Sequence, residues 1–148
     1  MKVLSIWQPW ASLIVNCHKN IETRGWPAPR SIIGKTIGIA STKNINKEQR
    51  RFVCEPEFMR QYSTTNLPAL DDLPLGYLLG TVIVEACNPI TSKMIEGLTD
   101  QERLFGWYSE GRFAWHLQEQ KAYSMPLPVI GKQGLWDWEV VQFETPAG

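Results

Sequence analysis

Hydrophobic and polar positions change their spacing twice within the first 25 residues, and each change predicts a new element. Residues 2–6 form a short run that is typical of a strand. Pro9 suits the first turn of a helix, where its missing N–H costs nothing. Four residues then recur at the i, i+3, i+4 and i+7 spacing of one helix face, namely Trp10, Leu13, Ile14 and Cys17. The pattern therefore predicts a strand followed by an amphipathic helix that ends near residue 18.

Directly after this helix the period becomes two, which predicts a second strand over residues 20–24. Glu22 and Arg24 share one face of this strand, and Thr23 points to the other. Lys19 stands at the turn between the helix and the strand. A lysine, a glutamate and an arginine gathered between two ordered elements make this segment the first candidate for a functional site.

Alternating patterns continue along the rest of the chain. Further strand patterns lie at residues 34–42, 77–86, 112–117 and around Trp136 and Trp138. Capping-box pairs open two more helices, Asn46 with Gln49 and Thr99 with Glu102. The first of these helices is expected to end at Pro56, and residues 63–76 to form a long loop. Six or seven short strands with two or three helices predict an α+β fold built on a mixed or closed β-barrel.

The composition narrows the class of protein. With 148 residues, 43% hydrophobic and 20% charged, we expect one folded domain over residues 1–143 and a loose tail at 144–148. No apolar run approaches the roughly 18 residues of a membrane span. Three cysteines without a CxxC pair favour a reducing, cytoplasmic compartment. His18 and His116 have no cysteine pair beside them, so neither a metal site nor a cofactor is predicted.

The two parts of the chain carry opposite charge, although the net charge is zero. Residues 1–60 contain ten lysines and arginines against four acidic residues, a net of +6. Residues 61–148 contain five against eleven, a net of −6. The basic part can supply a local patch for phosphates, unless the fold interleaves the two parts and their fields cancel. A pI of about 6.7 argues against a large nucleic-acid footprint, so any such contact should be small and local.

Several segments of the chain, in order, resemble the ASCH domain (activating signal cointegrator homology). They are Leu4-Ser-Ile-Trp-Gln-Pro-Trp-Ala-Ser-Leu-Ile14, Lys19-x-x-Glu22-x-Arg24, Ile39-Ala-Ser41, Leu73-Pro-Leu-Gly76, Gly111-Arg-Phe-Ala-Trp115 and Gly131-Lys-Gln-Gly-Leu-Trp136. The resemblance covers about residues 3–138. The hallmark of that family reads Gly-x-Lys-x-x-Glu-x-Arg. Cys17 stands here in the place of its glycine, the residue that usually ends a helix in the left-handed conformation.

The resemblance implies a PUA-like mixed β-barrel of about six strands with two or three peripheral helices. It also implies a cleft that holds Lys19, Glu22 and Arg24. PUA-like folds commonly handle RNA or modified bases, and one branch of the family hydrolyses N4-acetylcytidine with a threonine three residues after its lysine. That position is Glu22 here, so the nucleophile of that branch is absent. Another branch is reported as a ribonuclease, and further members bind nucleic acid without chemistry.

The first functional hypothesis is a binding module for RNA, single-stranded nucleic acid or a modified nucleoside, with no membrane partner. Lys19 and Arg24 would hold phosphate, and Glu22 would accept a hydrogen bond from the exocyclic amine of a base. A tryptophan beside them would stack on the base. The expected ligand-binding residues are Lys19, Glu22, Arg24, Trp7, Trp26 and Lys43. The alternative for the charged triplet is a purely structural ion pair of Glu22 with Lys19 or Arg24.

The second hypothesis is a hydrolase acting on RNA or on an N4-acylated cytidine in the same cleft. Lys19 and Glu22 would then work as an acid–base pair, and Ser41 as a nucleophile or orienting hydroxyl. A lone serine at a strand end is more often a turn former. A third hypothesis, a protein-interaction domain, would use the 63–76 loop and the basic helix that starts at Lys47.

Overall fold

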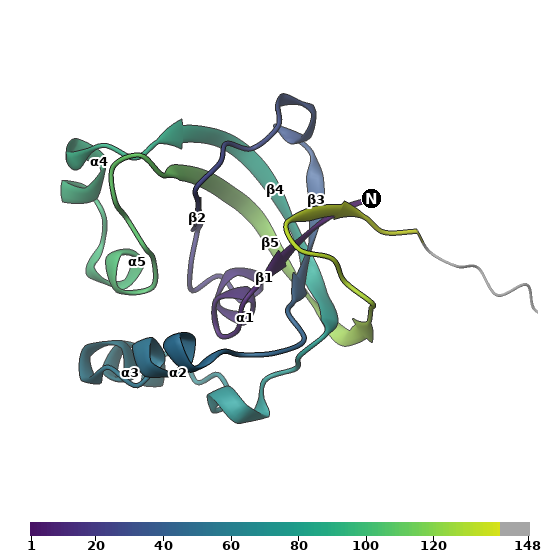
Figure 1. Cartoon of the computed structure of the whole chain (residues 1–148), viewed down its shortest axis with the longest axis horizontal. Coiled ribbons are helices and arrows are strands. Elements are labelled where there is room, and N and C mark those ends of the chain that lie inside the picture. Colours follow the sequence, from purple (N-terminus) through teal and green to yellow (C-terminus); the bar gives the residue numbers. More distant parts are fainter. Residues whose placement is uncertain (140–148) are drawn as a thin grey trace, which may run out of the picture.

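Six strands form one mixed sheet in the order β2–β5–β4–β3–β1–β6 (Figure 1). The computed structural model describes residues 1–139. The strands are β1 (Lys2–Ile6), β2 (Ile21–Arg24), β3 (Thr36–Ser41), β4 (Tyr77–Pro89), β5 (Phe113–Pro128) and β6 (Leu135–Asp137). β1 and β3 run parallel, and every other neighbouring pair is antiparallel. The mixed sheet of about six strands is therefore confirmed.

The sheet curls without closing. β2 and β6 stand at the two ends of the strand order, so residues 1–139 form a half-barrel instead of the closed barrel that was one expectation. The curl comes from β4 and β5, whose register shifts three times, as bulges that bend a strand pair do. Gly80 allows one of these bends, since a β-carbon there would lie 2.1 Å from the carbonyl oxygen of Lys121.

The described residues contain five α-helices, so the expectation of two or three was wrong. The helices are α1 (Trp10–Val15), α2 (Lys47–Val53), α3 (Pro56–Ser63), α4 (Ser92–Glu96) and α5 (Asp100–Leu104), with short 3-10 turns η1 (Arg30–Ile32) and η2 (Leu70–Asp72). The helix that begins at Lys47 ends at Val53, shortly before Pro56, and Pro56 itself opens α3 at its first position, where a proline is tolerated. α4 and α5 have five residues each, too few for a helical period to stand out. The second capping pair does open α5, because Thr99 accepts from the backbone of Glu102.

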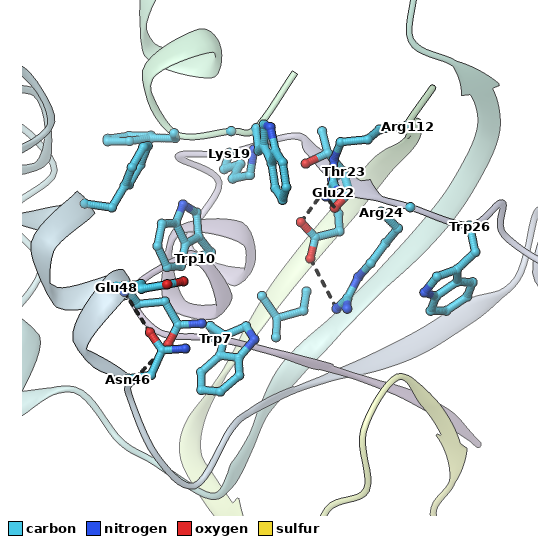
Figure 2. A pocket seen from close by; sticks show the side chains of 17 residues that line it. Trp7, Trp10, Lys19, Glu22, Thr23, Arg24, Trp26, Asn46, Glu48 and Arg112 are labelled. Atoms are coloured by element: carbon cyan, nitrogen blue, oxygen red, sulfur yellow. Dashed lines mark hydrogen bonds and ion pairs between the residues drawn. The ribbon is translucent and has the colours of Figure 1, made fainter. Parts of the chain in front are cut away.

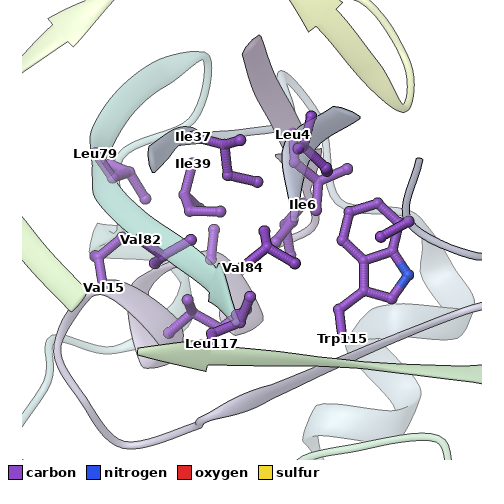
Figure 3. Packing of buried hydrophobic residues seen from close by; sticks show 14 residues of the cluster. Leu4, Ile6, Val15, Ile37, Ile39, Leu79, Val82, Val84, Trp115 and Leu117 are labelled. Atoms are coloured by element: carbon purple, nitrogen blue, oxygen red, sulfur yellow. The ribbon is translucent and has the colours of Figure 1, made fainter. Parts of the chain in front are cut away.

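α1 lies between two hydrophobic clusters. One face packs on the sheet, and Figure 1 shows the helix enclosed by the curve of the long strands. The members of this first cluster shown in Figure 3 include Leu4, Ile6, Val15, Ile37, Ile39, Leu79, Val82, Val84, Trp115 and Leu117. Leu13 on the opposite face joins a second cluster with α2, α3 and the end of α5, formed by Val53, Phe58, Tyr62 and Phe105. The buried helix thereby holds the segment that follows it, residues 17–24, against the sheet.

The end of α1 is a left-handed turn at Cys17, with a φ of 66°. His18 donates its N–H to the carbonyl of Leu13 at 2.9 Å, and Cys17 donates to Ile14 at 3.1 Å. These are the two hydrogen bonds of a Schellman motif, in which the left-handed residue is usually glycine. Cys17 thus adopts the backbone conformation that the hallmark glycine would favour.

We expect Cys17→Gly to raise the free energy of unfolding by about 0.5–1 kcal/mol, because relief of the left-handed strain exceeds the added freedom of the unfolded chain. Cys17 is exposed, so little packing is lost. Urea unfolding under reducing conditions measures the change. The matched control is Cys54→Gly, at the end of α2. Cys54 is equally exposed but has a φ of −79°, so glycine should destabilise there. A loss of stability in both variants would contradict the expectation.

No helix within residues 1–139 has the length and hydropathy needed to cross a bilayer. The expected domain end at residue 143 and the expected tail at 144–148 lie outside the described residues.

Candidate functional site

A hollow of about 480 Å³ lies between β2 and Trp7, a residue of the turn that follows β1 (Figure 2). Its volume falls in the range of roughly 300–1,000 Å³ typical of small-molecule sites. Its aromatic wall residues are Trp7, Trp10, Trp26, Phe52, Phe105 and Trp107. Its charged wall residues are Lys19, Glu22, Arg24, Glu48 and Arg112. The hallmark triplet is therefore brought together with Trp7 and Trp26, as the sequence predicted.

Lys19 is the most buried charge of the hollow, with 1% of its surface exposed. Its Nζ lies 3.4 Å from Oε2 of Glu102 on α5, not beside a neighbour in the sequence. The other carboxylate oxygen of Glu102 accepts from the backbone N–H of Asn20. Glu102 therefore compensates the charge of Lys19 and also fixes the backbone that carries it.

Tyr108 completes this buried group. Its hydroxyl donates to Oε2 of Glu102 at 3.0 Å, and its ring centroid lies 5.5 Å from Nζ of Lys19. Burial raises the pKa of Tyr108, and the neighbouring Glu102 charge adds to the rise. The phenol therefore stays protonated at neutral pH and serves Glu102 as a hydrogen-bond donor. The sequence interpretation missed Glu102 and Tyr108 as site residues, because the motif around Thr99 already explained the glutamate as a helix cap.

Glu22 lies on β2 with only 7% of its surface exposed. One carboxylate oxygen accepts from the backbone N–H of Thr23 at 3.0 Å, and the other lies 3.4 Å from Nη2 of Arg24 (Figure 2). Arg24 also donates from Nη2 to the carbonyl of Ser5 at 2.6 Å. Glu22 and Arg24 therefore form the ion pair that was expected if the charged triplet had a structural role. Both carboxylate oxygens of Glu22 still have lone pairs that can accept a hydrogen bond from a further donor.

Arg112 is a third cation of the hollow, and the sequence interpretation did not select it. Its Nη2 donates to the carbonyl of Thr23 at 3.0 Å, and its guanidinium lies 4.0 Å from the ring centroid of Trp107. Burial lowers its pKa, Glu22 raises it, and Arg24 lowers it further. The Gly111-Arg-Phe-Ala-Trp115 segment of the resemblance was the available signal. Register decides the placement of Arg112, because the next residue, Phe113, pairs with Arg24 of β2.

The tryptophans divide into buried and accessible ones. Trp7 and Trp26, the two expected stacking residues, are 36% and 38% exposed on the rim of the hollow. The ring of Trp26 stands edge-on to buried Trp115 at 5.0 Å between centroids, which holds its plane. Trp107 is 66% exposed and also lines the hollow, although the sequence interpretation did not name it. Trp10 lines the hollow as well, besides packing on Phe58.

Ser41 and Lys43 lie elsewhere. Both line a second, larger hollow of about 1020 Å³ that adjoins the first. The hydroxyl of Ser41 donates to the carbonyl of Tyr77 and accepts from its N–H, so it joins β3 to the start of β4. The structure therefore does not bring Ser41 together with Lys19 and Glu22. Within residues 1–139, no three histidine, cysteine, aspartate or glutamate side chains gather in a group that could hold a metal ion.

Comparison with known proteins agrees with this architecture. Crystal structures of an ASCH protein from Zymomonas mobilis superpose with a TM-score of 0.56 at 16% identity, over 94% of this chain and 87% of that one. A serine-to-alanine variant of the same protein gives 0.54 at 18% identity, over 94% and 88%. Its tyrosine-to-phenylalanine variant gives 0.54 at 16%, over 94% and 90%. At these identities the likeness concerns the fold alone.

Comparison with curated proteins found no match. The family model described as "ASCH domain" matches residues 4–126, a range that includes the hallmark segment and Arg112. This chain therefore belongs to the ASCH domain family.

Proposed function

We propose that the first hollow binds a nucleobase, presented by RNA, by single-stranded nucleic acid or by a modified nucleoside. The observation that carries the proposal is Glu22, a nearly buried carboxylate set among aromatic walls with acceptor capacity left on both oxygens. A buried charge of this kind is costly unless it is paired and hydrogen-bonded. The existing contacts to Thr23 and Arg24 leave room for one more donor.

The chemistry of the walls favours a flat ligand with an amino group. Aromatic side chains stack on bases of any sequence, and Trp7, Trp26 and Trp107 are accessible for this. An ionised carboxylate only accepts hydrogen bonds, so Glu22 would pair with the N4 amine of cytosine and repel the O4 carbonyl of uracil. Lys19 has donors beyond its contact with Glu102 and would serve a base carbonyl. The hollow is therefore suited to cytosine over uracil.

Binding is favoured over hydrolysis by the position of Ser41 and by the residue at position 22. Ser41, the nucleophile of the hydrolase hypothesis, lies in the second hollow with its hydroxyl engaged by Tyr77. Glu22 occupies the position of the threonine that the amidohydrolase branch uses. Incubation of the protein with N4-acetylcytidine and with single-stranded RNA, without added metal, tests the alternative. If cytidine or RNA fragments form in proportion to the enzyme concentration, the hydrolase hypothesis is favoured over binding.

Titration of the protein with cytidine and uridine, followed by tryptophan fluorescence, tests the binding proposal. We expect cytidine to change the emission of the wall tryptophans and to bind about tenfold or more tightly than uridine, because a hydrogen bond to a charged group contributes about 1.5–3 kcal/mol. The same titration with N4-acetylcytidine shows whether the hollow accepts a substituted amine. Equal affinities for cytidine and uridine would contradict the proposed contact with Glu22.

A further inference from the structure

The second hollow shares a wall with the first. Three residues line both of them, namely Trp7, Arg24 and Trp26. Beyond this wall the second hollow runs between the loop after β3, residues 41–44, and the loop between β5 and β6, residues 128–134. With about 1020 Å³ against 480 Å³, it is the larger space. A ligand placed in the first hollow can therefore continue past Arg24 into the second.

The charges of the two hollows differ. The lining of the second hollow contains three cations, Arg24, Lys43 and Lys132, and no carboxylate. The first has three cations and two carboxylates, Glu22 and Glu48. Within residues 1–139, Lys43 and Lys132 are exposed and form no ion pair. The second hollow thus presents uncompensated positive charge.

The loop that carries Lys132 is firmly anchored. The hydroxyl of Ser5 donates to the carbonyl of Lys132 at 2.6 Å and accepts from Nε1 of Trp136 at 2.8 Å. The N–H of Ser5 donates to the carbonyl of Gly134 at 3.0 Å. The chain around Lys132 is therefore held in place before any ligand arrives, which lowers the entropic cost of using it.

Arg24 connects the two spaces. Its contacts with Glu22 and with the carbonyl of Ser5 both use Nη2, while a guanidinium has five N–H donors in all. A planar guanidinium matches the geometry of a phosphate group. Arg24 can therefore contact a phosphate that joins a base in the first hollow to a sugar in the second.

We propose that the second hollow holds the phosphodiester and sugar next to the base bound in the first hollow, with Lys43 and Lys132 beside the phosphates. The ligand is then a single-stranded nucleic acid and not a free nucleoside. This inference rests on the proposed function, since it places the base in the first hollow.

The test compares cytidine, cytidine monophosphates and a six-nucleotide cytidine oligomer on the wild type and on Lys43→Gln/Lys132→Gln. The matched control is Lys35→Gln/Lys93→Gln, which removes the same charge at two exposed lysines outside both hollows. We expect the oligomer to bind more tightly than cytidine. The first double variant should lose about tenfold or more of the oligomer affinity and leave cytidine affinity unchanged, because two lysine–phosphate ion pairs are lost. The slope of log affinity against log salt should fall by about 1.4, roughly 0.7 for each lost phosphate contact.

Equal oligomer affinities in the two double variants would overturn the inference, while cytidine binding would still stand. A monophosphate as tight as the oligomer would also overturn it, since one phosphate would then fill the site. If the oligomer binds through Lys43 and Lys132 but cytidine does not bind, the phosphate site in the second hollow is supported. The proposed base site in the first hollow is then contradicted. If none of these ligands binds to the wild type, both proposals are wrong.

Discussion

Replacing Glu102 with glutamine should lower the free energy of unfolding by about 3–5 kcal/mol, the usual cost of leaving one charge of a buried pair without its partner. Lys19 would remain at 1% exposure with no carboxylate beside it. Glutamine retains the shape of the side chain and an acceptor for the N–H of Asn20, so the loss would report the missing charge. Urea unfolding with a constant m-value measures it.

Two further variants separate the ion pair from general damage to α5. Asp100→Asn breaks the exposed Asp100–Arg103 pair on the same helix and should have a far smaller effect. Lys19→Met should cost less than Glu102→Gln, because Glu102 keeps its hydrogen bonds from Tyr108 and Asn20. The double variant should then be more stable than Glu102→Gln alone, since no unpaired lysine remains. Additive losses in the double variant would show that Lys19 and Glu102 do not stabilise each other.

Replacing Glu22 with glutamine should lower the affinity for cytidine by about tenfold or more and remove the preference over uridine. The glutamine amide can still accept from the N4 amine, but it loses the charge that strengthens this hydrogen bond to about 1.5–3 kcal/mol. Its NH2 group can also donate to the O4 of uracil, so uridine should bind as well as before or better. The ratio of the two dissociation constants is therefore the quantity to measure.

The same hollow supplies the control. Glu48 lines its rim on α2 and is exposed, so Glu48→Gln removes an equal charge without touching the proposed contact. It should leave the ratio of cytidine to uridine affinity unchanged. If both variants reduce the ratio equally, the effect comes from the overall field of the hollow and not from a contact with Glu22. Urea unfolding of Glu22→Gln shows whether loss of the Arg24 pair has disturbed the fold.

Local patterns predicted the elements that carry the hallmark segment. The apolar spacing of residues 10–17 and the alternation that follows correspond to α1 and β2. The helix ends at Val15 and its left-handed turn is at Cys17, close to the expected end near residue 18. The capping box of Asn46 and Gln49 is present with both of its hydrogen bonds. α4 and α5 were not separately predicted, because a five-residue helix is decided by its packing and caps rather than by a period of its own.

The partners of the Glu102 side chain could not be predicted from local sequence patterns. Its backbone N–H does bind the hydroxyl of Thr99, as the capping pattern predicted. Its side chain turns to Lys19 and Asn20, more than 80 residues earlier in the sequence, instead of returning to the cap. Nothing in the spacing near residue 102 signals that partner. The choice depends on how α5 packs against α1 across the second cluster.

The sequence by itself determined that the six strands exist, the helix before the hallmark segment and the family to which that segment belongs, because these depend on residues that are neighbours along the chain. It did not predict that β5 continues from Leu117 to Pro128, because that length comes from pairing with β4. Only the tertiary structure decided that Glu102 and not Glu22 pairs with Lys19, that Arg112 and Trp107 join the hollow, and that Ser41 and Lys43 lie in the space beyond Arg24. The reason is physical: sheet register, the curl of β4 and β5 and the packing of α5 bring these residues together, and each depends on contacts far apart in the sequence.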